Sequence, residues 1–111
     1  YKQVMAAGKS ELGAEAQYHY AEILFAQNKL GDAEKAAFDV IKKSGSYEYW
    51  VTKSYVLLGD IYFKEKDWFN AEATFKSIID NATIAELKTE AQQKLALVLE
   101  EKNKANKVEQ P

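Results

Sequence analysis

The sequence predicts an all-α protein assembled from repeated helix-turn-helix units. The chain of 111 residues aligns with itself, because residues 21–41 superpose on residues 59–79 at a shift of 59 − 21 = 38. A repeat period of roughly 20 to 50 residues is typical of solenoids, whose units bury their apolar faces only against their neighbours. The only proline is the last residue, and a background rich in Ala, Lys and Glu with few glycines favours helix nearly throughout.

Residues 1–8 are expected to be the end of a preceding repeat. At a shift of 75 − 1 = 74, Tyr1 matches Phe75 and Val4 matches Ile78, both of which stand in the second helix of a later unit. We therefore expect the chain to open inside a helix of an earlier unit, and the native protein to continue upstream.

The first complete unit is expected over residues 10–44, with helices at 11–28 and 31–44. Gly8 stands where the preceding helix needs a left-handed residue at its end. Ser10 follows as an N-cap, since its hydroxyl can accept a hydrogen bond from a free amide of the first turn.

The second unit is expected over residues 47–81, with helices at 47–66 and 68–81. Gly45 and Ser46 repeat the pattern of a helix-ending glycine followed by a capping serine. The two units are joined by a link that is long for a helical repeat, and this link accounts for the long period.

Small residues occupy the positions where the two helices of a unit cross. Gly59 aligns with Ala21, and Ala71 aligns with Ala33. A large side chain at such a position would hold two helix axes beyond their usual separation of about 8–10 Å. We expect the tightest crossing at Gly59, where alanine should be tolerated and leucine should not.

A last helix over residues 83–104 is expected to cap the array. At a shift of 86 − 11 = 75 its sequence matches the first helix of the first unit. Thr83 and Glu86 have the spacing of a capping box, in which two side chains satisfy free backbone amides reciprocally. Beyond this helix the sequence is too polar to bury anything, so residues 105–111 are expected to be a disordered tail.

The pattern of residues resembles the tetratricopeptide repeat family, whose unit is a helix-turn-helix of 34 residues with small and aromatic residues at fixed spacings. The matching positions of the second unit are Tyr55, Leu58, Gly59, Tyr62, Trp68, Ala71, Phe75 and Ile78. The first unit matches less closely, with Gln17, Tyr20, Ala21, Leu24, Ala33, Ala37 and Val40. The chain departs from the family in its period of 38, in the missing closing proline, and in Asn28 and Lys66, which replace the turn glycine.

The resemblance implies a right-handed solenoid that binds a partner peptide or helix in the concave groove lined by the first helix of each unit. The groove positions carried over from the family are Glu15, Tyr18, Glu22, Phe25 and Ala26, then Lys53, Val56, Asp60, Phe63 and Lys64, then Glu90, Gln93, Leu97, Glu100 and Glu101. The residues expected to contact the partner are Tyr18, Glu22, Phe25, Lys53, Asp60, Phe63 and Lys64. Glu22 and Asp60 would repel a terminal carboxylate, which disfavours the carboxylate clamp that some members of the family use. Phe25 and Phe63 are either groove anchors or core residues, and the sequence leaves both readings open.

Composition disfavours several other classes of function. Fifteen basic and seventeen acidic residues give a formal charge of −2, with no basic stripe for nucleic acid. No stretch approaches the roughly 18 consecutive apolar residues of a membrane span. Without cysteine, a serine-histidine signature or a glycine-rich phosphate loop, no enzyme and no cofactor are expected. His19 stands between Glu15 and Glu22 on one helix, but no second helix supplies a matching metal-binding motif.

The sequence therefore predicts a protein-protein interaction or scaffolding module whose partner is a protein or peptide. The alternative is a structural module that self-associates as a homodimer through its exposed end face. The long links between units resemble those of periplasmic repeat proteins in bacterial envelope complexes, so a bacterial protein of the periplasm, of the outer-membrane surface or of the cytoplasm is expected, without a choice among these compartments.

Overall fold

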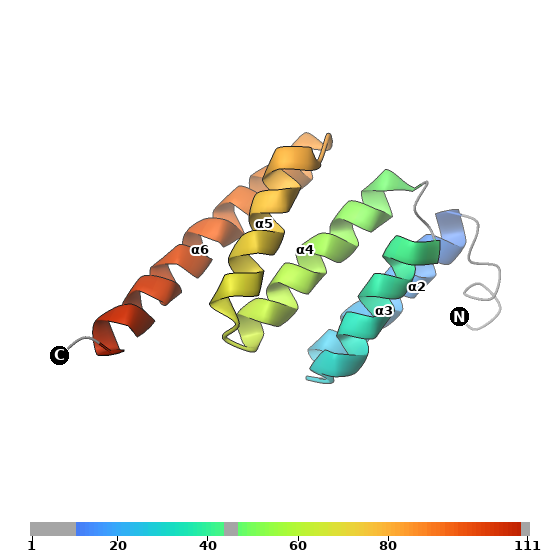
Figure 1. Cartoon of the computed structure of the whole chain (residues 1–111). Helices are drawn as coiled ribbons and strands as arrows, with labels where there is room; N and C mark the ends of the chain where they lie inside the picture. Colours follow the sequence, from blue (N-terminus) through green and yellow to red (C-terminus); the bar gives the residue numbers. More distant parts are fainter. Residues whose placement is uncertain (1–10, 44–46, 110–111) are drawn as a thin grey trace.

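The computed structural model describes residues 11–43 and 47–109, and this part of the chain is all-helical (Figure 1). Its helices are α2 (Glu11–Ala26), α3 (Leu30–Lys43), α4 (Glu48–Lys64), α5 (Trp68–Asn81) and α6 (Ala85–Glu109). The helix and caps expected at residues 1–10, and the cap at Gly45 and Ser46, lie outside the described residues. The predicted fold class is confirmed at the level of an all-α protein.

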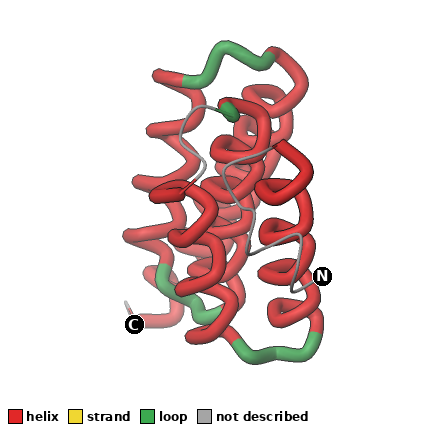
Figure 2. Tube along the Cα trace, turned by 90° about the vertical axis from the view of Figure 1, so that its right-hand side faces the viewer, coloured by secondary structure: helices red, strands yellow, loops and turns green. Residues whose placement is uncertain are grey.

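The helices alternate in direction along the chain. α2, α4 and α6 run the same way, and α3 and α5 run the opposite way (Figure 1). Each helix packs against the next one in sequence, and α4 also touches both α2 and α6. The connections between the described helices lie at two opposite ends of the molecule (Figure 2). This arrangement brings the carboxyl ends of α2, α4 and α6 to the same end of the molecule.

Two apolar clusters hold the helices together. One joins α2, α3 and α4 through buried residues that include Leu24, Val40, Leu58 and Ile61. The other joins α4, α5 and α6 and is centred on Phe75, whose side chain is fully buried. Each cluster is filled from three successive helices, so no single helical hairpin could bury its apolar residues alone.

The small residues expected at the helix crossings are inside the protein. Ala21, Ala33 and Ala71 are completely buried. Gly59 is also buried, and a Cβ atom built on it would overlap the ring of Phe75. The sequence predicted that alanine would be tolerated at Gly59, but the Phe75 ring occupies the place of that methyl group, so we now expect alanine to be unfavourable there.

The turns that close α2 and α4 have the same backbone geometry. Asn28 and Lys66 have φ angles of 63° and 61°, in the left-handed region that favours glycine. At each turn the left-handed residue donates its amide to a carbonyl three residues back, and the next residue donates to a carbonyl five residues back. This is the Schellman motif that commonly ends a helix, and it explains why the family favours glycine at the two positions.

The start and the end of α6 both differ from the expectation. The carbonyl of Ile84 accepts the first hydrogen bonds of the helix, and the Thr83 hydroxyl donates to Glu48 of α4, so the expected capping box between Thr83 and Glu86 does not form. The helix continues to Glu109 instead of giving way to a disordered tail at residue 105. Lys104 lies 3.4 Å and 3.2 Å from the carboxylates of the preceding turn, and pairs of this kind stabilise a helix that has little to bury.

Candidate functional site

A pocket of about 540 Å³ opens where the carboxyl ends of α2 and α4 meet the start of α5. Its walls come from α2, α4, α5 and α6 and from the turn between α4 and α5. The lining residues are Phe25, Asp60, Phe63, Lys64, Lys66, Trp68 and Glu101. Four of the seven residues expected to contact a partner are thus brought to one place.

Three aromatic rings form the apolar part of the pocket. Phe63 and Trp68 meet edge to face, with ring centroids 5.3 Å apart and an interplanar angle of 72°. Phe25 faces them from α2 and carries the Lys64 ammonium 5.6 Å from its ring centre, within the range of a cation-π contact.

Phe25 and Phe63 are half-buried, and each also packs against one of the two apolar clusters. The sequence left open whether Phe25 and Phe63 are groove residues or core residues. In the structure each ring is both, because one side packs against the core and another side lines the pocket.

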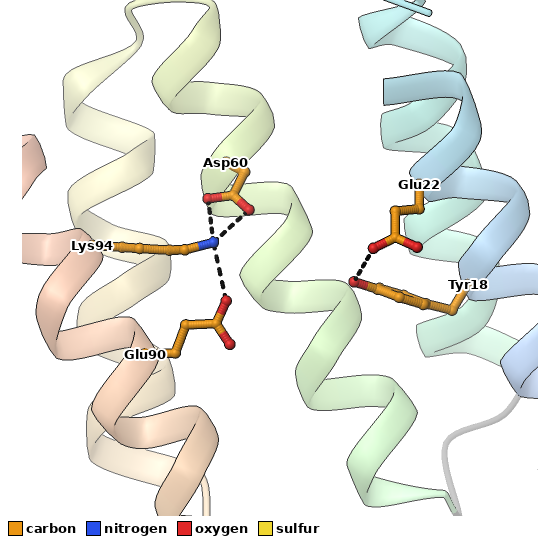
Figure 3. Close-up of polar contacts among 5 residues, drawn as sticks. All are labelled: Tyr18, Glu22, Asp60, Glu90 and Lys94. Atoms are coloured by element: carbon orange, nitrogen blue, oxygen red, sulfur yellow. Dashed lines mark hydrogen bonds and ion pairs between the residues drawn. The ribbon is translucent and has the colours of Figure 1, made fainter. Parts of the chain in front are cut away.

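Asp60 links α4 to α6 at the edge of the pocket (Figure 3). Its carboxylate oxygens lie 2.9 Å and 2.7 Å from the Lys94 ammonium, which also lies 3.1 Å from Glu90. Burial raises the pKa of Asp60, and Lys94 offsets this only in part because Glu90 adds a second negative charge nearby. Burial lowers the pKa of Lys94, but its hydrogen bonds to the two carboxylates outweigh that effect and leave the pKa raised. The ammonium therefore stays charged and neutralises Asp60 at the rim.

The other three residues expected to contact a partner form a separate cluster between α2 and α4. Tyr18 is only 5% exposed and belongs to the core, its ring lying 5.6 Å from that of Trp50. Lys53 covers the Tyr18 ring at 5.4 Å, and the Tyr18 hydroxyl lies 3.4 Å from Glu22 (Figure 3). Burial and the negative charge of Glu22 raise the pKa of Tyr18. The structure thus places Tyr18 in the core and leaves Lys53 and Glu22 above it. Val56, another expected groove position, is buried as well.

Sequence reasoning missed Trp68, Lys66 and Lys94 as parts of this site. Lys66 lies in the turn between α4 and α5, and Trp68 is the first residue of α5. The signal that could have found the site is the tryptophan itself, because tryptophan is enriched at contact surfaces. Lys94 carries no sequence signal of its own, because its partner Asp60 lies 34 residues away on another helix.

His19 takes part in polar contacts with its own helix. Its ring nitrogens lie 3.0 Å from Glu22 and 3.8 Å from Glu15. Across residues 11–43 and 47–109, no group of three or more histidine, aspartate and glutamate side chains is placed to hold a metal ion.

Within the same residues, no helix is both long and apolar enough to cross a membrane.

The outer face of α2 is apolar and exposed. Leu12, Tyr20 and Ile23 are 63%, 46% and 46% exposed. At the repeat shift of 38, Tyr20 and Ile23 correspond to Leu58 and Ile61 of α4. These two side chains are 2% and 0% exposed, and they belong to the apolar cluster that joins α2, α3 and α4. The face of α4 that carries Leu58 and Ile61 is therefore buried, whereas the corresponding face of α2, which carries Tyr20 and Ile23, is exposed.

The chain matches no protein-family model, no curated protein and no solved structure. The resemblance to the tetratricopeptide repeat family rests on the residues and spacings of the chain itself.

Proposed function

We propose that this chain is a tetratricopeptide-like solenoid segment that serves as a protein-protein interaction module. It binds a peptide or a helix of a partner protein in the groove formed by α2, α4 and α6, and it acts by binding rather than by catalysis. The two units stack in a right-handed sense, α6 caps them, and the groove is concave.

The observation that supports this proposal is the pocket between the carboxyl ends of α2 and α4, the start of α5 and Glu101 of α6. Ligand sites are concave and mostly apolar, with a few polar groups that fix orientation, and this pocket has an aromatic lining inside a charged rim. Binding energy concentrates on aromatic side chains that are partly exposed in such hollows. An apolar side chain of a bound helix or peptide would fill the space between Phe25, Phe63 and Trp68.

The experiment selects peptides from a random library on the immobilised chain and measures their affinity for designed variants. Phe25→Leu and Phe63→Leu keep most of the apolar volume that packs on the core but remove the ring that faces the pocket. We expect each to weaken the selected peptides by about three- to tenfold, the usual worth of an aromatic contact beyond its area. A Trp50→Phe background leaves Trp68 as the single fluorescent reporter of binding.

The matched control is Phe38→Leu, because Phe38 is a partly exposed phenylalanine on α3, outside the pocket. Its affinity for the peptides should equal that of the parent chain, and all variants should melt cooperatively. Selection of no peptide, or of peptides that leave Trp68 fluorescence unchanged and bind both pocket variants at full strength, would contradict the proposal.

A second candidate function is self-association through the outer face of α2. It is favoured by the exposure of Tyr20 and Ile23 at positions whose counterparts in α4 are fully covered. In this reading a second copy of the chain covers the face. Sedimentation at increasing chain concentration distinguishes it from the first candidate, which needs only a monomer.

A further inference from the structure

The rim of the pocket carries two acidic and two basic side chains. They are Asp60, Glu101, Lys64 and Lys66. A count of formal charges therefore suggests no preference for an acidic or a basic occupant. The contacts of the four side chains within the chain, however, favour one sign of charge.

Both acidic residues of the rim already have cationic partners. Asp60 lies 2.7 Å from the Lys94 ammonium, and Glu101 lies 3.2 Å from the Lys104 ammonium. The negative charge of each carboxylate is therefore already offset by a cation of the same chain.

Neither basic residue of the rim has such a partner. No carboxylate of the described residues forms an ion pair with Lys64 or Lys66, and both side chains are exposed. Lys64 contacts the face of Phe25, and this contact leaves the N–H groups of its ammonium available to donate to a carboxylate of a partner. The charge of the rim that is not neutralised within the chain is therefore positive, although the whole chain carries a formal charge of −2.

The backbone conformation of Lys66 is a second unusual feature of the rim. It holds a φ of 61°, a conformation that the Cβ of lysine disfavours and that glycine or asparagine adopts more readily. The equivalent turn of the preceding unit has Asn28 at this place, with a φ of 63°. Strained residues of this kind tend to occur at functional sites. The strained lysine stands at the rim of the pocket, and the asparagine at the equivalent turn does not line it.

We propose that the partner segment places a bulky apolar side chain in the space that Phe25, Phe63 and Trp68 line, and an acidic side chain within reach of Lys64 and Lys66. This inference rests on the proposed function, since it names the chemistry of the partner that the groove accepts. The acidic group is a glutamate or aspartate side chain beside the apolar anchor.

The experiment uses three synthetic peptides that share one central leucine and differ only in the residues that flank it. The flanking residues are glutamine, glutamate or lysine. Binding to the full chain is measured by calorimetry at low and at high salt. We expect the glutamate peptide to bind about two- to fivefold tighter than the glutamine peptide for each ammonium engaged, and the lysine peptide to bind more weakly than both. The advantage should shrink at high salt, because exposed charges are screened.

Variants assign the effect to the rim. Lys64→Gln and Lys66→Gln should each reduce the preference for the glutamate peptide, and the double variant should remove it while the glutamine peptide binds as before. Lys35→Gln is the matched control, because Lys35 is an exposed lysine of α3 that does not line the pocket. It should leave the preference unchanged.

Different results would overturn the proposed function and the inferred acidic chemistry of the partner. If none of the three peptides binds, and library selection also yields none, the proposed function itself is overturned. If the glutamine peptide binds and the glutamate peptide binds no tighter, the groove remains a binding site and the inferred acidic chemistry is wrong. A preference for glutamate that survives in the double variant also overturns the inference.

Discussion

Gly59 sets the distance between α4 and α5 because its missing side chain makes room for the Phe75 ring. The ring is completely buried, and a Cβ atom at Gly59 would overlap it, so a methyl group added there forces the ring or the helices to shift. The position therefore tests whether close packing outweighs helix propensity, since alanine is the better helix former by about 1 kcal/mol.

We expect Gly59→Ala to destabilise the chain, with an overpacking cost of about 1–3 kcal/mol that exceeds the gain in helix propensity. Phe75→Leu removes the obstructing ring, so the same alanine should be neutral or stabilising in that background. Urea unfolding of the two single variants and the double variant measures this coupling, which should exceed about 0.5 kcal/mol.

Gly31→Ala is the control for this cycle. Gly31 also lies in a helix, but a Cβ atom there would meet nothing within 4 Å. It should stabilise the chain by up to about 1 kcal/mol. Equal effects of the two alanine substitutions would show that the Phe75 ring yields easily and that Gly59 does not fix the crossing.

At the scale of whole helices, α5 and α6 are joined by an ion pair as well as by apolar packing. Glu72 of α5 lies 2.7 Å from the Lys76 ammonium on its own helix and 2.8 Å from the Lys102 ammonium on α6. Hydrogen bonds from Lys102 and Lys76 lower the pKa of Glu72 from 4.5 to about 2. A carboxylate whose pKa falls on folding stabilises the folded state at pH values above its unfolded pKa.

We therefore expect the contribution of Glu72 to be complete above pH 4.5 and to disappear as the pH falls towards 2. Glu72→Gln should flatten the acid side of the stability profile in this window. Thermal melts of the variant and the parent chain between these pH values measure the difference. Glu86→Gln replaces an exposed carboxylate of α6 that forms no ion pair within the described residues, and it should leave the profile unchanged. Parallel profiles for parent and Glu72→Gln would contradict the assignment.

At the scale of the whole molecule, the described helices differ in how much of their apolar surface is covered. α4 has helices packed on both sides, whereas the apolar face of α2 that carries Tyr20 and Ile23 is exposed. Exposed apolar surface of this kind is often an interaction site, because covering it removes apolar area from water.

If a second copy covers this face, the chain sediments as a dimer at high concentration and as a monomer on dilution. Tyr20→Glu and Ile23→Glu should then each abolish the dimer, because a desolvated carboxylate in an apolar interface is strongly unfavourable. Phe69→Glu is the control, since Phe69 is 71% exposed on α5, a helix outside this face. A chain that stays monomeric at every concentration excludes self-association.

The internal repeat determines much of the local structure from the sequence alone. The shift of 38 predicted the helices of both units and the small residues that they bury against each other, although α2 and α4 end two residues earlier than expected, at Ala26 and Lys64. These features follow from local propensity and from the spacing of apolar residues, which act over a few turns of helix. They also placed Phe25 and Phe63 one unit apart on parallel helices, which is why these two rings were expected at one site.

The tertiary structure decided which of those residues face a pocket and which face the core. Tyr18 and Phe25 lie seven residues apart on one face of α2, yet Trp50 and Lys53 of α4 cover the first and leave the second at the edge of a hollow. The pairing of Asp60 with Lys94, which leaves the rim of the pocket positive, joins residues of different helices. Periodicity within one helix determines which side chains share a face, but their burial and charge balance depend on what the neighbouring helices place against that face.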